Sequence, residues 1–231
     1  MIMNDICAQV LDLAKRQLGY KETGNNNTKY SRFFDVEAWQ WFNTKKQGAE
    51  WCAIFICWLF AQNETLGQKQ ALSFLGCPQP KDNCAAGVPY LYKYLEAKGY
   101  KRTNKADGVP GDIIVLYSKK HVGIIEKVEN GKYITIEGNK SNYVAHGSYG
   151  VNSSTITAVF HPAWDNAHFF NSSKTDADVK EQLYINLAKK CIQGFYGNGL
   201  IRKKRINSLG YGDIYSKVQN YVNLILAGKV K

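Results

Sequence analysis

The sequence predicts an α+β domain followed by a small helical module, and three changes of pattern along its 231 residues support this prediction. Apolar residues recur at helical spacing in the N-terminal part of the chain, as they do in amphipathic and buried helices. Short segments rich in β-branched residues follow from residue 111 and indicate antiparallel strands. Helical spacing returns after residue 179, so we expect helices packed on an antiparallel sheet and then a separate helical bundle.

Helices are predicted in the first part of the chain. Asn4 or Asp5 can cap an N-terminal helix, and residues 88–98 form another, with a proline in its first turn and a glycine after it. Between them, the segment that starts at Cys52 is apolar on nearly every side, which predicts a buried helix beginning near that cysteine. Residues 21–50 contain many turn-forming residues, and we expect them to be mostly loop.

Four strands are predicted after these helices. The segments 111–117, 121–128 and 132–138 are short, rich in β-branched residues and separated by turn residues, and 155–162 is a further candidate. His146 falls between the third and the fourth segment, in a stretch of Gly, Ser and Tyr that we expect to be a flexible loop. The first domain is therefore an antiparallel sheet on which the N-terminal helices pack.

Composition places the domain boundary at residues 166–178. This stretch is short of aliphatic residues and rich in small polar ones, so we expect a linker between a first domain at 1–165 and a helical module at 179–231. The chain has a formal net charge of +11, and residues 178–231 hold ten Lys or Arg against three Asp or Glu, a local net charge of +7. This basic excess indicates an anionic partner, which can be nucleic acid, a membrane surface or a cell wall.

Several classes of protein are disfavoured by the same reading. The N-terminus lacks a basic region followed by an unbroken apolar stretch, so we expect no secretory signal and synthesis in a cytoplasm. The longest apolar run, at 53–61, is too short to span a bilayer, and we expect no membrane insertion. The six cysteines show no paired metal-ligand spacing, so we expect no metal and no cofactor. Cys77 and Cys84 flank a loop that a disulfide could close, although reduced thiols are the ordinary state in a cytoplasm.

Cys52 and His121 are the predicted nucleophile and base of a cysteine-dependent site. The helix dipole and the unpaired N–H groups at a helix start stabilise a thiolate, and the same N–H groups can help to form an oxyanion hole. His121 stands at a predicted strand start, beside a loop. If the strands around it form a hairpin, Glu137 or Asn139 comes within reach of His121 and can orient the imidazole. Cys57, inside the apolar helix, is expected to be a buried and inert thiol.

Four segments together resemble the CHAP (cysteine, histidine-dependent amidohydrolase/peptidase) domain, a papain-like domain related to the NlpC/P60 hydrolases. They are WCAIF, PGDIIVLY, HVGIIEKVENGKYITIEGN and AVFHP, and the likeness covers roughly residues 5–164. The resemblance implies a papain-like fold with Cys52 as the nucleophile and His121 as the base. It also implies that Glu137 and Asn139 are the third and the supporting polar members of the site.

The chain departs from the pattern of this family at two places. Many CHAP sequences have Gln directly before the nucleophilic Cys, whereas this chain has Trp51, so the side-chain donor of the oxyanion hole stays open. The chain also has no acidic loop resembling the calcium site of some CHAP domains. This second departure agrees with the expectation that no metal is bound.

The tail resembles one copy of the CW_7 wall-binding repeat of certain lysins, over roughly residues 181–226. The matching stretches are GFYGNG, the RKKR run, GY and VQNYVN. The likeness implies a three-helix bundle that recognises a muropeptide, with Tyr196, Asn198, Arg202 and Tyr211 at its binding surface. It favours bacterial peptidoglycan as the partner and disfavours nucleic acid.

Both resemblances predict a peptidoglycan hydrolase of the phage endolysin type, released to the wall by a holin. The cleaved bond would be the N-acetylmuramoyl-L-alanine amide or a cross-bridge peptide bond, and the sequence does not choose between them. Two alternatives stay open: a catalytically silent protein that binds walls, and a cytosolic papain-like protease with a nucleic-acid-binding tail. The oligomeric state is also left open.

Overall fold

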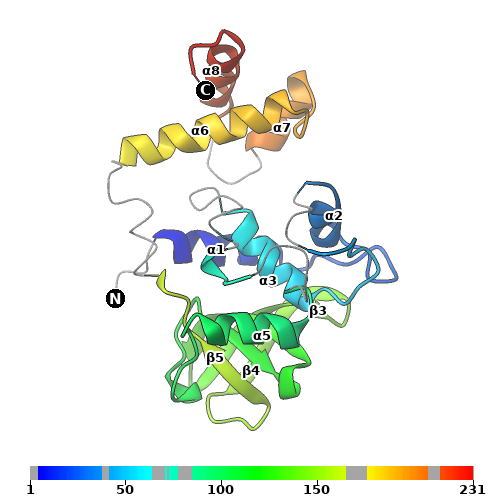
Figure 1. Ribbon diagram of the computed structural model, residues 1–231, viewed down its shortest axis with the longest axis vertical. Coiled ribbons are helices and arrows are strands. Elements are labelled where there is room, and N and C mark those ends of the chain that lie inside the picture. The colour runs from blue at the N-terminus through cyan, green and yellow to red at the C-terminus, as the bar shows by residue number, and fades with distance from the viewer. Residues whose placement is uncertain are drawn as a thin grey trace. The chain divides into compact units, whose positions relative to one another are not determined.

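The computed structural model describes residues 5–37, 42–63, 71, 73–77, 85–164, 176–207 and 214–230. The chain divides into two compact units, at residues 1–170 and 171–231. The first unit combines helices with a five-stranded sheet, and the second is helical (Figure 1). Over the described ranges, no helix is long and apolar enough to cross a membrane. The predicted α+β fold with a helical module is therefore confirmed.

The helices described in the first unit are α1 (Asp5–Lys15), α2 (Lys29–Val36), α3 (Cys52–Ala61) and α5 (Val88–Ala97). Three of them lie where the sequence predicts helices, but α2 falls in the stretch that we expected to be loop. That prediction was wrong because Thr28 caps the helix, its hydroxyl accepting from the N–H of Ser31 at 3.0 Å. Tyr30, Phe33 and Phe34 then bury one side of α2.

The sheet consists of β1 (Ile113–Leu116), β2 (His121–Glu129), β3 (Lys132–Lys140), β4 (Tyr143–Gly150) and β5 (Ile156–Phe160). All neighbouring strands are antiparallel, in the order β4-β3-β2-β1-β5. The prediction of a flexible loop around His146 was wrong, because this residue lies in β4. The buried residues of β4 are Val144, Gly147 and Tyr149, and the glycines and polar residues of this segment conceal the strand in the sequence.

The larger hydrophobic core lies between the helices and one face of the sheet. In this layer α3 contacts both β2 and β3. Gly138 of β3 is essential to the contact, because a Cβ atom on it would lie only 2.6 Å from the Cβ atom of Phe55 in α3. The helix that begins with Cys52 can therefore approach the sheet closely. Figure 1 shows α3, in cyan, against the green strands.

The second unit contains α6 (Asp176–Ile192), α7 (Gly199–Asn207) and α8 (Tyr215–Leu226) around a core of its own. Its buried residues are Leu187, Ala188, Cys191, Ile206, Ile214, Val218 and Val222. Helix α6 begins inside the predicted linker, so 166–178 is not linker throughout. The earlier part of that stretch lies outside the described residues. Cys84 does too, so the possible disulfide between Cys77 and Cys84 is not tested.

Candidate active site

Cys52 is the first residue of α3 and lies at the positive end of the helix dipole. No side-chain cap binds the first N–H groups of this helix, so they are not engaged in the usual capping bond. Trp51, fully buried, donates from Nε1 to a carboxylate oxygen of Glu22 at 2.9 Å and so anchors the helix start. Cys52 itself is 5% exposed. Cys52 is therefore an almost completely buried residue at a helix start whose N–H groups can face a reacting group.

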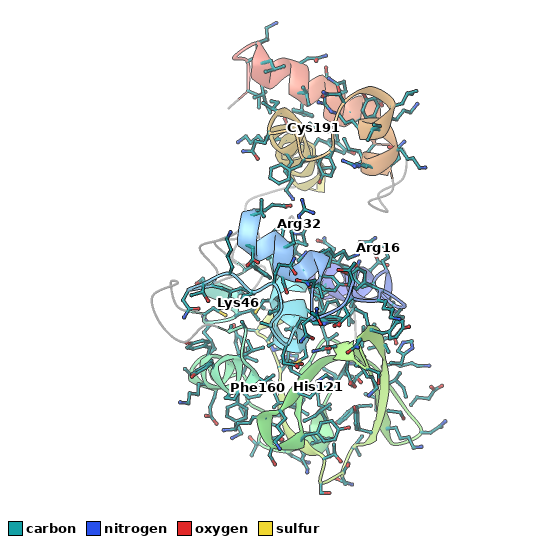
Figure 2. All side chains as sticks on the ribbon, turned by 90° about the vertical axis from the view of Figure 1, so that its right-hand side faces the viewer. Arg16, Arg32, Lys46, His121, Phe160 and Cys191 are labelled. Carbon is teal, nitrogen blue, oxygen red and sulfur yellow. The ribbon has the colours of Figure 1, made fainter. Side chains whose placement is uncertain are left out.

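His121 is the first residue of β2 and lies between two partners. Its Nε2 atom is 3.0 Å from Oε2 of Glu137, and the ring is also hydrogen-bonded to Cys52. Because Glu137 engages Nε2, the other ring nitrogen, Nδ1, is the one left for the thiol. Burial lowers the pKa of His121, but the hydrogen bonds to Cys52 and Glu137 outweigh it and raise the pKa to about 9. Figure 2 shows His121 beside α3, where that helix meets the green strands.

The turn that leads into β2 has an uncommon backbone. Tyr117, Ser118 and Lys119 have φ values of 50°, 54° and 71°, in the left-handed region that residues other than glycine rarely adopt. The turn is held by a hydrogen bond from the N–H of Tyr117 to Thr155 at 2.9 Å. Lys119 also lies 3.8 Å above the ring centre of Tyr92 in α5. These contacts fix the residues directly before His121.

Glu137 is 0% exposed, and both of its carboxylate oxygens accept hydrogen bonds. Oε1 accepts from the hydroxyl of Thr135. Oε2 faces His121 and accepts from Lys140 Nζ and from the Tyr149 hydroxyl, each at 3.2 Å. Burial raises the pKa of Glu137, but the hydrogen bonds from His121 and Thr135 hold it below its usual value. The carboxylate is therefore ionised and can orient the imidazole and stabilise its protonated form.

Two glycines leave the space that this carboxylate occupies. A Cβ atom on Gly123 of β2 would lie 2.7 Å from Cγ of Glu137. A Cβ atom on Gly147 of β4 would lie 2.5 Å from the hydroxyl oxygen of Thr135 and would overlap Oε1 of Glu137. The strands on both sides of β3 therefore need glycine where they flank Glu137.

Asn139 lies beside this chain of contacts and has other partners. Its side-chain amide donates to Glu50 and, at 3.5 Å, to Oδ1 of Asn26. Its φ of 58° accompanies a register irregularity between Glu137 and Lys140 at the end of β3. The predicted site residues thus separate: Cys52, His121 and Glu137 form a linked set, whereas Asn139 bonds to Glu50 and Asn26.

The sequence reasoning missed Thr135, Lys140 and Tyr149, which surround the Glu137 carboxylate. Thr135 could have been found, because residues two apart in a strand share one face of the sheet. Tyr149 could not, because it lies in β4, which was predicted to be a loop. Over the described ranges, no three His, Cys, Asp or Glu side chains are grouped to hold a metal ion.

In the second unit, Arg202 is bound to its own loop. Nε donates to the carbonyl of Gly197 and one terminal nitrogen donates to Oδ1 of Asn198, both at 2.9 Å. Arg202 therefore fixes the loop between α6 and α7. Tyr196 packs against the core of the unit. Tyr211, the fourth predicted wall-binding residue, lies outside the described residues.

Comparison with protein-family models gives two matches. The CHAP domain model matches residues 43–139, a span that includes Cys52, His121, Glu137 and Asn139. The CW_7 repeat model matches residues 186–226. No curated protein and no solved structure matches the chain. A CHAP domain implies an amidase or peptidase of the peptidoglycan hydrolase type, and CW_7 is a cell-wall-binding repeat. The chain therefore contains a CHAP domain of this type followed by a C-terminal CW_7 repeat.

Proposed function

We propose that this protein is an endolysin that cleaves an amide bond of bacterial peptidoglycan, with Cys52 as nucleophile, His121 as proton carrier and Glu137 as the group that orients His121. The observation that supports it most is the unbroken line of contacts from the thiol through the imidazole to a buried carboxylate. Nucleophilic cysteine catalysis needs these three functions in contact. The CW_7 repeat in the same chain supports peptidoglycan as the substrate.

The proposed reaction uses the thiolate form of Cys52, which is the nucleophilic form of cysteine, beside an imidazole that is protonated because the pKa of His121 is raised to about 9. The thiolate attacks the amide carbonyl carbon, and the N–H groups at the start of α3 are the donors available to the oxyanion. The imidazolium gives its proton to the leaving nitrogen as the C–N bond breaks, which leaves a thioester on Cys52. His121 then takes a proton from water, whose oxygen attacks the thioester. The carboxylate product leaves, and the thiolate and imidazolium are restored.

The bond in question is the N-acetylmuramoyl-L-alanine amide or a peptide bond of the cross-bridge. We propose that the helical unit holds the enzyme on the wall through Tyr196, Asn198, Arg202 and Tyr211. The hydrogen bonds of Arg202 support a contribution through the shape of the α6–α7 loop. A phage origin and holin-dependent release belong to the same proposal, and the pairing of a CHAP domain with a wall-binding repeat supports them.

Replacing Cys52 by Ala tests this function, with Cys57→Ala in the same helix as the matched control. Cys57 is fully buried, and its thiol donates to the carbonyl of Ala85 at 3.7 Å. We expect Cys52→Ala to lower the rate of wall hydrolysis by roughly a thousandfold or more, because the nucleophile is gone. Cys57→Ala should keep its rate per folded molecule. Turbidity of purified Gram-positive walls gives the rate, and mass spectrometry of the released fragments identifies the bond.

Three outcomes would contradict the proposal. Undiminished hydrolysis by Cys52→Ala would remove the assigned nucleophile. Binding to walls without any cleavage by the unaltered protein would favour a silent wall-binding protein. Cleavage of unfolded protein substrates together with binding to nucleic acid, and no binding to walls, would favour a cytosolic protease with a nucleic-acid-binding tail.

A further inference from the structure

The hairpin of β3 and β4 surrounds the far side of the Glu137 carboxylate with two side chains that no domain match assigns a function. From this arrangement we propose that Lys140 and Tyr149 are positioning residues, which hold Glu137 against His121, and that the charge of Lys140 sets the pH at which His121 loses its proton. This inference rests on the proposed function of Cys52, His121 and Glu137.

The three side chains form a closed triangle of hydrogen bonds. Lys140 Nζ donates to Oε2 of Glu137 and to the hydroxyl of Tyr149, and that hydroxyl also donates to Oε2, each at 3.2 Å. His121 lies 3.0 Å from the same oxygen. The other oxygen, Oε1, is occupied by Thr135. The carboxylate is thus fixed from both sides, and Oε2 is aimed at the imidazole by partners that do not include the thiol.

Burial makes the charge of Lys140 necessary. Glu137 is fully buried, whereas the Lys140 side chain is 33% exposed and reaches solvent. A buried carboxylate without a counter-charge is costly, and His121 supplies one only while it is protonated. In the proposed reaction His121 gives its proton to the leaving nitrogen. Lys140 then remains as the cation that keeps the carboxylate compensated.

The same charge must act on the imidazole. Both nitrogen atoms contact Oε2, at 3.0 and 3.2 Å, so they are no more than 6.2 Å apart. A like charge at this separation disfavours the protonated ring, whereas Glu137 favours it. Lys140 therefore limits how far the pKa of His121 rises, and a ring of lower pKa gives its proton to the leaving nitrogen more readily.

Besides Lys140, polar or titratable side chains from four neighbouring segments contact His121 or Glu137. They are Cys52 from α3, Tyr117 from the turn before β2, Thr135 from β3 and Tyr149 from β4. Burial raises the pKa of Tyr149, which also bonds to Tyr117, so its hydroxyl stays protonated in the pH range of the test. Lys140 forms an ion pair with Glu137, and its replacement isolates the effect of this charge.

The test compares Lys140→Met, Lys140→Arg and Tyr149→Phe in the full chain, with Lys132→Met as a control at the exposed, opposite end of the same strand. Wall hydrolysis is measured against pH and wall concentration. For Lys140→Met we expect the alkaline fall in rate to move upward by about one pH unit, because the repulsion on the imidazolium is lost. Lys140→Arg should restore the original profile. Tyr149→Phe should lower kcat by about tenfold with KM unchanged, because the carboxylate is held less firmly.

The inference would be overturned if the alkaline fall in rate of Lys140→Met were not shifted and a lower melting temperature explained any loss of rate. Lys140 would then be a structural residue. A shift of the same size in Lys132→Met would also overturn it, because the effect would then come from net charge. Full activity in Cys52→Ala would instead remove the proposed function, so the two failures can be told apart.

Discussion

Among its described residues, the first unit contains two pairs of a histidine with a buried carboxylate, and in one of them the histidine also bonds to a thiol. Glu137 with His121 and Asp112 with His161 are alike in their parts. Both carboxylates are fully buried, and they lie 3.0 and 2.7 Å from their ring nitrogens. Each also binds a cation, which is Lys140 for Glu137 and an arginine for Asp112.

The second pair differs in what surrounds the histidine. Nδ1 of His161 lies 3.0 Å from Arg102 as well as against Asp112, so Arg102 and His161 share one carboxylate. Asp112 also accepts from the N–H of Val109 at 3.1 Å and so fixes the loop before β1. The nearby thiol of Cys7 is buried, and burial together with the charge of Asp112 raises its pKa to about 12. Cys7 also lies in the first turn of a helix, but its thiol donates to the carbonyl of Pro110 at 3.8 Å, whereas Cys52 bonds to the ring of His121. A thiol in a first helical turn near a buried Asp–His pair is therefore not sufficient for a nucleophile, since the ring must also bond to the thiol.

The largest difference between the two pairs is expected when each histidine is replaced by alanine in turn. We expect His121→Ala to lower the rate of wall hydrolysis by about a thousandfold or more, because the proton carrier is lost. His161→Ala should keep most of the rate per folded molecule, since Asp112 retains Arg102 and the Val109 N–H. Turbidity assays with thermal unfolding curves of both variants give the two quantities. Equal losses of rate at equal folded fraction would place the Asp112 pair in the active site as well.

A smaller effect is expected from the glycines of β4. Gly147→Ala places a methyl group against Glu137 and Thr135, whereas a Cβ atom on Gly150 of the same strand would meet nothing within 4 Å. Displacing the carboxylate by about 1 Å is expected to lower kcat up to roughly a hundredfold, with a loss of stability of about 1–3 kcal/mol. Gly150→Ala should change neither. Denaturant unfolding and wall hydrolysis measure both, and equal behaviour of the two variants would show that β4 does not constrain Glu137.

The smallest effect is expected in the pH dependence of hydrolysis by the unaltered protein. Hydrolysis should persist up to about pH 9 and fall above it, because His121 then loses the proton that the leaving nitrogen needs. The pKa of His121 is raised in the folded state, so its stabilising contribution is complete below about 6.5 and is lost as the pH rises through about 9. Melting temperatures of the unaltered protein and His121→Ala should therefore converge above about pH 9. An alkaline limb near 6.5 would mean that the ring is not held between thiol and carboxylate.

Much of the site could be predicted because strong local patterns carry it. The apolar run predicts α3 with Cys52 at its start, and the β-branched segments predict the hairpin of β2 and β3 that carries His121 and Glu137. The choice between Glu137 and Asn139 could not be made in advance. The observed register pairs Ile124 with Ile136, and its regular continuation would bring Asn139 across from His121, yet the end of β3 is irregular and Asn139 bonds to Glu50.

The two elements that the sequence did not predict, β4 and α2, were missed for the same physical reason. β4 contains glycines and polar residues with weak β-propensity, and it exists because it pairs with β3 along its length. Tyr149 was missed with it. α2 was missed because a single capping threonine and three aromatic residues define a helix of only eight residues. In both cases tertiary contacts decide the structure, and periodicity within one short segment does not reveal them.

The left-handed turn before His121 implies that a gain in stability of the fold would lower the rate of hydrolysis. Three successive non-glycine residues with positive φ each carry a backbone cost of roughly 1–2 kcal/mol. Glycine at Ser118 would relieve part of that cost, and it would also free the peptide link that aims the imidazole. Selection for thermal stability alone would thus favour a variant with a higher free energy of unfolding and a lower rate of hydrolysis. If His121 is the proton carrier proposed above, the strain of this turn is retained because it orients the imidazole.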